Sequence, residues 1–433
     1  MTERIPCTRE GCSATILPTT AEKTGGYCMP CKQEMKRQER QLYIDKHRRD
    51  VNLYEGIADP VEILKIMHTN LEYDPMIRYT PYKQNKEQLY MSLSAEDAGK
   101  MLDYAVNLLV SGDEDTSKDI LLSLVCYKNI SLSAWIPELI SRELYYPGIL
   151  FKDASEEVRN QLMDQVEYDN DNRNHLLSAL VWIGDEQVVQ RLHEWRKSSP
   201  EWVGNLNISP DLYTYEAGWE LTEEGERHNL FYGYSYAIEK VEKAEESVHG
   251  ASESVILLTE SSHTCLWCGG KLTTLLDIGV SHPFFEFLSL AGERLKVETC
   301  VICGCYGTVY MDVDLNGETK WSTYNKRPDY LPDINHDDYD DQYLSASKSF
   351  RIASQPRSVY HAAEWTLEPT VSQVGGHPSW IQDAEYPACP CCSKRMTFIS
   401  QLDWGEIEKH GEGIYYMFLC PNSMITATLF QQS

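Results

Sequence analysis

The hydrophobic pattern of the chain predicts a helical part followed by a strand-rich part. Between about residues 59 and 197, apolar side chains recur at the spacing of helices with one buried face. Asp, Ser or Asn precedes most of these segments, as expected at helix N-caps, and the short turns between them suggest antiparallel pairs. The predicted helices cover residues 60–68, 95–110, 116–127, 134–144, 155–168, 175–183 and 186–197.

The C-terminal part carries the pattern of paired strands. Residues 307–314 alternate between apolar and polar, Asn316-Gly317 favours a hairpin turn, and residues 319–322 continue as the second strand. Residues 396–402 and 414–419 are apolar and β-prone, as expected of paired strands buried in a core.

The segment between these parts, residues 201–260, is turn-rich and aromatic. It predicts short strands and a connector, then a helix rich in both charges at about residues 236–248. Residues 250–254 predict an exposed joint.

Four cysteines near the N-terminus form two close pairs, Cys7 with Cys12 and Cys28 with Cys31. This spacing is typical of a structural zinc knuckle. A segment this short cannot build an apolar core, so metal binding would supply its folding free energy, on the order of 10 kcal/mol. The alternative is four unligated thiols that pack as small apolar side chains.

A second set of two pairs lies in the strand-rich part. Cys265 and Cys268 precede a predicted strand, and Cys300 and Cys303 follow another. Two such pairs, each attached to a strand, predict a zinc ribbon with these four thiolates as ligands. Cys305 remains an alternative to Cys303.

A third set contains Cys389, Cys392 and Cys420. Its fourth ligand is not assigned, and Cys391 and His410 are the candidates. Since structural zinc normally has four protein ligands, thiols packed in the core without metal are the alternative. The sequence therefore predicts two zinc sites and does not decide whether the third set of cysteines binds zinc.

The net charge of −27 narrows the class of partner. It disfavours nucleic acid and acidic membranes, and it suits a basic protein. Residues 32–50 are locally basic, so a nucleic-acid interface formed by residues 1–50 is an alternative. Because base-stacking aromatic residues are not interleaved there, we favour a solvated helix that packs through Met35, Leu42 and Tyr43.

An acidic stretch at residues 328–350 raises the question of calcium. The spacing of its aspartates does not match an EF-hand loop, and the required Gly is missing. A solvated acidic loop on which a basic partner docks is the preferred interpretation. The aspartates concerned are Asp329, Asp333, Asp337, Asp338, Asp340 and Asp341.

The sequence predicts neither secretion nor a membrane span. The N-terminus has no apolar signal core, and no apolar run approaches the roughly 18 residues of a bilayer span. We expect a cytoplasmic protein, in which reduced thiols favour metal ligation over disulfides.

No catalytic motif of a metalloprotease, serine hydrolase or phosphate loop is present. The complete Cys sets are closed, and His68, His175 and His193 are isolated in the predicted helices, where packing or surface roles are expected. We therefore expect a protein that is not an enzyme. A redox or metal-relay role for Cys389-Pro-Cys-Cys392 is the alternative.

Together these patterns predict an α+β multidomain protein with four segments. Residues 1–50 form a zinc knuckle with a basic helix, and residues 51–205 form a helical domain resembling HEAT repeats. Residues 206–260 connect this domain to a β-rich domain at residues 261–433, which contains a zinc ribbon. The alternative for the helical segment is a plain helical domain that covers the zinc domains.

A motif near the C-terminus resembles a known family. Gly375-Gly-His-Pro-Ser-Trp-Ile-Gln382 precedes the Cys389 and Cys392 pair, and the strands that follow read Phe398-Ile-Ser-Gln-Leu402 and Phe418-Leu-Cys420. This order resembles the TYPP superfamily, which includes YwqG-like bacterial proteins and programmed-cell-death-protein-2-like chaperones. The resemblance extends back to about residue 261. One position departs from the pattern, since Ser423 stands where a second Cys is expected after Cys420.

The resemblance implies protein binding. Bacterial members look like immunity proteins against polymorphic toxins, and eukaryotic members look like chaperones of a ribosomal protein. Our first expectation is an immunity protein whose acidic surface binds a basic toxin domain. The alternatives are a chaperone or adaptor for a basic protein of the ribosomal type, and a nucleic-acid-binding zinc protein acting through residues 1–50.

Overall fold

The computed structural model describes residues 3–241, 256–281, 285, 290–334, 349–408 and 411–432. The chain folds into two compact units, Met1–Leu89 and Tyr90–Ser433. Three features expected from the sequence lie outside the described residues: the joint at 250–254, His410, and the part of the acidic stretch that holds Asp337, Asp338, Asp340 and Asp341.

The first unit holds the N-terminal cysteines and a few short elements. Strands β1 and β2 pair antiparallel around the first Cys pair, and strands β3 and β4 pair in parallel. Asp59 caps α3 by accepting a hydrogen bond from the Val61 N–H, as the sequence predicts. The elements are β1 Ile5–Pro6, β2 Thr15–Ile16, α1 Pro18–Thr24, α2 Met29–His47, β3 Arg49–Val51, α3 Pro60–His68, β4 Ile77–Tyr79 and α4 Lys86–Ser92, which crosses into the second unit.

The basic helix α2 does not pack as the sequence suggests. We expected Met35, Leu42 and Tyr43 to anchor it, but Leu42 is 70% exposed and Tyr43 is 59% exposed. The buried side chains of α2 are Cys31 and Ile44. The helix is held at its N-terminal end by the Cys cluster, and most of its length faces solvent.

The predicted helices of the second unit are present, with the caps that the sequence indicated. Ser94, Asp113, Ser155 and Asp185 each accept a hydrogen bond from a backbone N–H in the first turn of the following helix. Gly184 ends α9 in the left-handed conformation. The helices are α5 Ala95–Ser111, α6 Glu114–Lys128, α7 Ile136–Ser141, α8 Glu156–Tyr168, α9 Arg173–Ile183 and α10 Glu186–Lys197.

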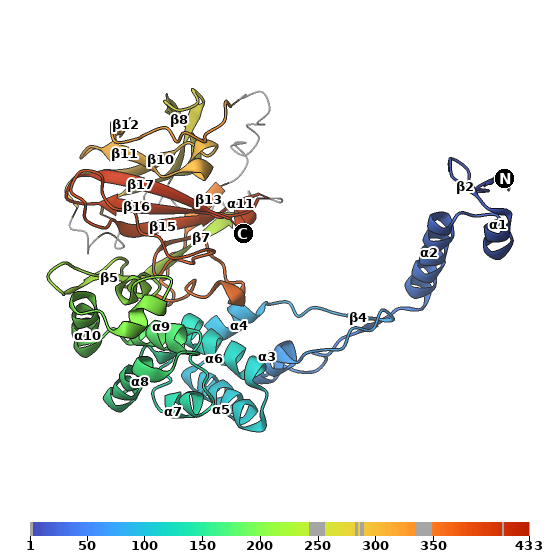
Figure 1. Cartoon of the computed structure of the whole chain (residues 1–433), viewed down its shortest axis with the longest axis horizontal. Helices are drawn as coiled ribbons and strands as arrows, with labels where there is room; N and C mark the ends of the chain where they lie inside the picture. The colour runs from blue at the N-terminus through green and yellow to red at the C-terminus, as the bar shows by residue number, and fades with distance from the viewer. Residues whose placement is uncertain are drawn as a thin grey trace. The chain divides into compact units, whose positions relative to one another are not determined.

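The remainder of the second unit is built on an eight-stranded sheet, and helices α5 to α10 lie on one side of the strand-rich part (Figure 1). The strand order is β12-β11-β17-β16-β15-β14-β7-β13, and every named pair in it is antiparallel. The strands are β7 Ser235–Val241, β11 Val309–Val313, β12 Thr319–Trp321, β13 Ser349–Ile352, β14 Gln373–Gly375, β15 Thr397–Asp403, β16 Ile414–Cys420 and β17 Ile425–Gln431. The two predicted strand pairs, β11 with β12 and β15 with β16, are therefore confirmed.

A second, three-stranded sheet packs against the first. Its order is β10-β9-β8, with β8 at Ile256–Thr264, β9 at Lys271–Gly279 and β10 at Arg294–Thr299. Leucines of β9 and β10 share one hydrophobic cluster with Met417 and Leu419 of β16. A short hairpin, β5 Trp219–Leu221 with β6 Arg227–Asn229, lies between the helices and β7 in the sequence.

Strand β16 is buried on both faces, which explains its continuous apolar sequence. Tyr415, Met417 and Leu419 join the cluster shared with the three-stranded sheet. The alternate residues, including Tyr416 and Phe418, join a second cluster on the opposite face. Successive side chains of a strand point to opposite faces, so a strand with two buried faces has no polar positions.

One predicted element is wrong. The sequence suggested a helix at about residues 236–248, but residues 235–241 form strand β7, which pairs with β13 and β14. The rest of that predicted helix lies outside the described residues. The helix was predicted because charged residues such as Glu239 and Lys240 are typical of a helix surface. The segment is a strand because it pairs with strands more than a hundred positions away in the sequence.

Replacing Phe418 with Ala tests the importance of the second face of β16. Phe418 is completely buried in an aromatic cluster, so the variant should lose about 3–5 kcal/mol of unfolding free energy. Urea unfolding followed by tryptophan fluorescence measures this loss. Val110→Ala, on the exposed surface of α5, is the control and should change the free energy by less than about 0.5 kcal/mol. Equal effects of the two substitutions would contradict the assignment of Phe418 to the core.

Candidate metal centres

The cysteines of each predicted set come together in space. Three groups have their sulfur atoms within 4.8 Å of one another. They are Cys7, Cys12, Cys28 and Cys31; Cys265, Cys268, Cys300 and Cys303; and Cys389, Cys392 and Cys420. All 14 cysteines are free thiols, so none of these contacts is a disulfide.

The sulfur spacings fit a tetrahedral metal ion. Zinc–sulfur bonds of about 2.3 Å place neighbouring ligand sulfurs about 3.8 Å apart. Cys12 and Cys28 have their sulfurs 3.8 Å apart, and the separation is 3.7 Å both for Cys268 with Cys300 and for Cys392 with Cys420. Each group can therefore hold a metal ion of zinc size.

The two C-terminal groups are built from the same arrangement of elements. In each group, a C-x-x-C turn precedes one strand. A further Cys lies at the end of the strand that pairs antiparallel with it. Cys265 and Cys268 precede β9, and Cys300 follows its neighbour β10. Cys389 and Cys392 precede β15, and Cys420 ends its neighbour β16. The strands that come next, β11 and β17, pair with each other, so the two modules meet inside one sheet.

Backbone hydrogen bonds repeat between the two C-x-x-C turns. The Cys265 N–H donates to the Gly270 carbonyl and the Gly269 N–H donates to the Cys265 carbonyl, both at 2.8 Å. The equivalent bonds at Cys389 involve Lys394 and Ser393, again both at 2.8 Å. Ser393, like Gly269, has a positive φ, a conformation that a Ser adopts only at a cost in free energy. The turn geometry is thus maintained even where Gly is absent.

The third group is completed by a hydroxyl. The oxygen atom Oγ of Ser423 lies 3.0 Å from the sulfur of Cys389, 3.2 Å from that of Cys420 and 3.8 Å from that of Cys392. Ser423 occupies the position in this module that Cys303 occupies in the other. Sequence reasoning noted Ser423 as a departure from the family pattern but did not consider it as part of the site.

The other candidate ligands lie apart from these groups. Cys391 and Cys305 are exposed, and the Cys305 sulfur contacts the Tyr415 hydroxyl at 3.9 Å. The group that contains Cys265 therefore includes Cys303 and not Cys305. His410 lies outside the described residues.

Backbone N–H groups favour the thiolate form of one cysteine in the first and third groups. The N–H groups of Cys28 and Arg9 lower the pKa of Cys7 to about 6, and the Cys28 nitrogen lies 3.2 Å from the Cys7 sulfur. The Lys394 N–H lowers the pKa of Cys392. In the second group, hydrogen bonds from the Cys300 and Cys303 thiols lower the pKa of Cys265. Thiolate is the form that binds metal.

Cys126 belongs to none of the three groups. It is fully buried in α6, and burial raises the pKa of its thiol. Cys126 is thus an ordinary core side chain.

The isolated histidines join no Cys group. His175 is exposed beside Tyr146, with the ring centroids 5.3 Å apart, and His68 is buried in α3. Burial lowers the pKa of His193. Packing and surface positions of this kind were expected from the sequence.

The second unit also contains an open cleft of about 770 Å³. The motif that carries the TYPP resemblance lines one side of it, through His377, Trp380, Ile381 and Gln382. The helical part contributes Trp182 and Ser178 of α9, and the ring centroid of Trp182 lies 5.0 Å from that of His377. Tyr146, Pro147, Gly148, Ile149, Glu216, Ala363, Glu364, Trp365, Asp383 and Ala384 complete the lining. These residues could not be grouped from the sequence, because they come from five separate segments of the chain.

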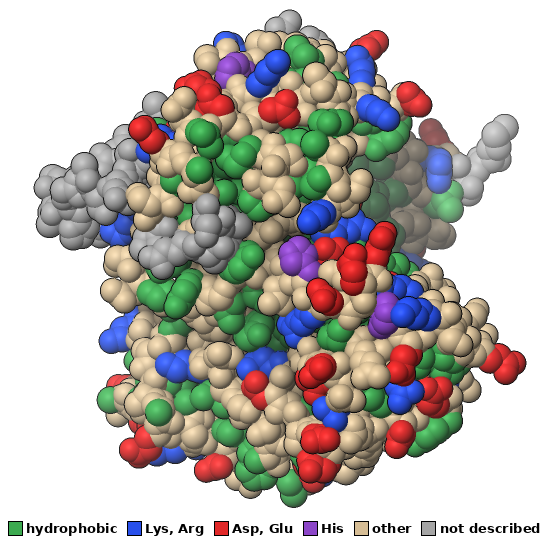
Figure 2. Space-filling model, turned by 90° about the vertical axis from the view of Figure 1, so that its left-hand side faces the viewer, with side chains coloured by type: hydrophobic (Ala, Val, Ile, Leu, Met, Phe, Trp, Pro, Cys, Tyr) green, Lys and Arg blue, Asp and Glu red, His purple; other side chains and the backbone are tan. Residues whose placement is uncertain are grey.

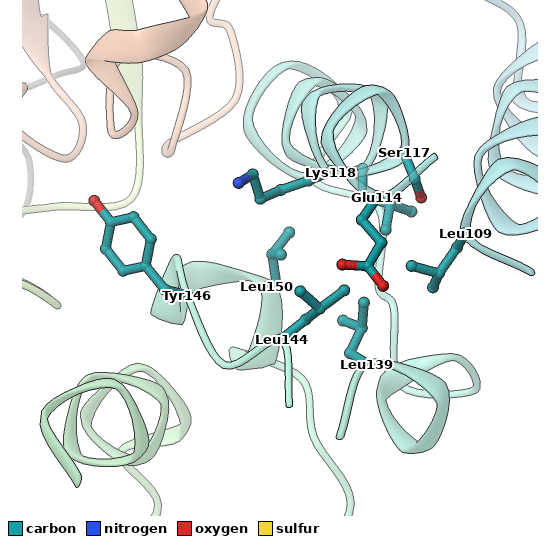
Figure 3. Close-up of a pocket in the computed structure, with 9 residues that line it drawn as sticks. Leu109, Glu114, Ser117, Lys118, Leu139, Leu144, Tyr146 and Leu150 are labelled. Atoms are coloured by element: carbon teal, nitrogen blue, oxygen red, sulfur yellow. The ribbon is translucent and has the colours of Figure 1, made fainter. Parts of the chain in front are cut away.

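A smaller cavity lies among the helices (Figure 3). Leucines 109, 139, 144 and 150 surround the Glu114 carboxylate, and Arg142 lies 3.7 Å from that carboxylate. Tyr146 lies at the edge of this cavity, away from the leucines, and also lines the larger cleft. The cavity is apolar and its carboxylate has a partner, so we assign it no ligand.

Among the described residues, no helix combines the length and apolar content needed to cross a membrane. The fold and its sites define a protein of mixed helix and sheet with three cysteine groups that can hold metal ions.

The chain belongs to the same family as a protein of Salmonella typhimurium strain LT2 described as "Uncharacterized protein YpfL". The two are 36% identical over 438 residues, and the similarity covers 100% of both proteins. No protein-family model matches the chain, and no solved structure matches it. The HEAT-like description of the helices therefore stays a prediction.

Metal analysis of the purified chain tests the three groups. We expect at least two zinc ions per chain, because two groups offer four thiolates each. Removing zinc with a chelator should unfold the segment at residues 3–47, whose hydrophobic cluster consists mainly of cysteines. Circular dichroism and mass spectrometry under native conditions measure both results. A chain without metal, or a fold that chelation leaves intact, would contradict the prediction.

A reciprocal pair of substitutions tests the role of Ser423. Ser423→Cys gives the third group a fourth thiolate and should strengthen its metal binding by at least about tenfold. Cys303→Ser makes the second group resemble the third and should weaken its binding to a similar degree. Competition with a chromogenic chelator measures both affinities, and Cys391→Ser is the control that should change neither. If Ser423→Cys left the affinity unchanged, Ser423 would not belong to the metal centre.

Proposed function

We propose that this protein is a non-catalytic binding protein, and that its partner is a basic toxin domain that it neutralises as an immunity protein. The cysteine groups would hold zinc and keep the strand modules rigid, so that the surface recognising the partner is formed before binding. Preorganisation of this kind lowers the entropy cost of association.

The closed form of the cysteine groups is the observation that carries the non-catalytic part of the proposal. Catalytic zinc needs an open coordination position and usually has a His ligand. The first two groups offer four sulfurs each, the third offers three sulfurs beside the Ser423 hydroxyl, and none of the three contains a His. A structural role fits this chemistry better than turnover does.

The charge of the chain supports a basic partner. A net charge of −27 accelerates association with a basic protein by electrostatic steering. Acidic and basic side chains are intermixed on the face shown in Figure 2, so recognition there would depend on local groups in addition to the overall charge. Of the acidic stretch, Asp329 and Asp333 lie within the described residues, and Arg327 lies 3.5 Å from Asp333.

The resemblance to the TYPP superfamily supports protein binding in a second way. It also leaves one alternative, a chaperone for a basic protein of the ribosomal type. The two functions share the chemistry of the partner and differ in its identity.

Capture of the partner from the native host tests the proposal. The tagged chain is purified from its own cells, and the bound proteins are identified by mass spectrometry. A toxin encoded beside the gene should be captured, and co-expression of the chain should restore growth of cells that produce this toxin. Enrichment of ribosomal proteins would favour the chaperone alternative. Failure to bind or neutralise the neighbouring gene product would refute the immunity function.

A further inference from the structure

The open cleft of the second unit has an aromatic lining that is accessible to solvent. Tyr146 is 54% exposed and Trp365 is 58% exposed, although both are large and apolar. Trp182 and Trp380 are half-buried within the same lining. Exposed aromatic side chains in a concave site are a common feature of protein-binding surfaces.

The ionisable side chains of the cleft are acidic. Glu216, Glu364 and Asp383 line it, and no Lys or Arg is among its lining residues. Burial lowers the pKa of His377 to about 4, so this imidazole is uncharged at neutral pH. The cleft therefore presents negative charge without a positive group of its own.

Glu216 is the carboxylate most affected by this arrangement. The Ser178 hydroxyl donates to its oxygen Oε2 at 2.9 Å. Desolvation of its carboxyl group raises the pKa of Glu216, and repulsion from the charge of Asp383 raises this pKa further. A cation bound between them would remove this repulsion.

The walls of the cleft are fixed by the TYPP-like motif. The ring nitrogens of His377 lie 2.8 Å from the Pro378 carbonyl oxygen and 2.9 Å from the Glu216 carbonyl oxygen. The indole of Trp380 stacks on Tyr416 of β16, with the ring centroids 4.6 Å apart. The motif thus connects the segment of Glu216 to the core of the sheet.

We propose that this cleft is the docking site for an arginine- or lysine-bearing segment of the protein partner, whose cation is held between the carboxylates and the aromatic rings. This inference rests on the proposed function, because it assigns the surface that meets the basic partner. Cations bind favourably over aromatic faces and beside carboxylates.

Binding of a short basic peptide tests the cleft directly. The probe is a fluorescein-labelled Gly-Arg-Gly-Arg-Gly peptide, and its control has citrulline in place of each Arg, which keeps the shape but removes the charge. Fluorescence anisotropy with the full-length chain should show at least about tenfold tighter binding of the arginine peptide. Equal binding of the two peptides, or no binding at about 1 mM, would overturn the proposal.

Variants of the lining residues locate the binding site. Glu216→Gln combined with Asp383→Asn keeps the shape of the cleft and should weaken the arginine peptide at least about tenfold, while Trp365→Ala should weaken it by roughly 2- to 30-fold. Glu201→Gln and Tyr168→Ala replace exposed residues outside the cleft and should stay within about twofold of the natural chain. Near-ultraviolet circular dichroism checks that each variant is folded. Equal losses in cleft and control variants would place the peptide elsewhere.

Capture of the natural partner separates this inference from the proposed function. If the cleft variants capture the partner as well as the natural chain does, the cleft is not the docking site and the binding function stands. If the natural chain binds the arginine peptide and captures no partner, the binding function fails and the cation site stands.

Discussion

Clustered sulfur atoms are the constraint on which the strand-rich part depends. Each C-terminal group joins the turn before one strand to the turn after its antiparallel neighbour, so a single ion would clamp the two strands together at one end of the pair. The first group, with Cys7 and Cys31, has the same role for a segment that has almost no other core. Metal binding would therefore fix this end of each strand pair, and burial of β16 stabilises the sheet along the rest of its length.

The TYPP-like motif connects this sheet to the helices. Gly376 adopts a positive φ where a Cβ atom would approach the Ser235 side chain to 2.7 Å, so the turn requires Gly. The N–H of the next residue, His377, donates to the Val359 carbonyl at 2.7 Å. The motif that suggested the family thus forms one wall of the cleft. Tight backbone packing explains both why its residues are recognisable in the sequence and where the motif lies in the structure.

The sequence predicted local features better than distant ones. Helices with a capping residue, such as those after Ser94 and Asp185, lie close to their predicted bounds because the cap and the apolar spacing are both local signals. The cysteine pairs were equally readable from their spacing. Strand β7 was missed because its partners lie far along the chain, and the cleft was missed because its residues come from five segments. From the sequence, Ser423 was recognised only as a departure from the family pattern. A serine is not identified as part of a metal site until the structure shows which sulfur atoms surround its hydroxyl.

The hydroxyl of Ser423 has a consequence for how the protein would respond to scarcity of metal. If all three groups bind zinc, two have four sulfurs and one has three sulfurs and an oxygen. As the free ion becomes rare, the weaker centre would empty first, while the N-terminal knuckle and the other module stay loaded. The strand pair of β15 and β16 would then loosen next to the motif that forms the cleft, and affinity for a partner would follow the zinc supply of the cell.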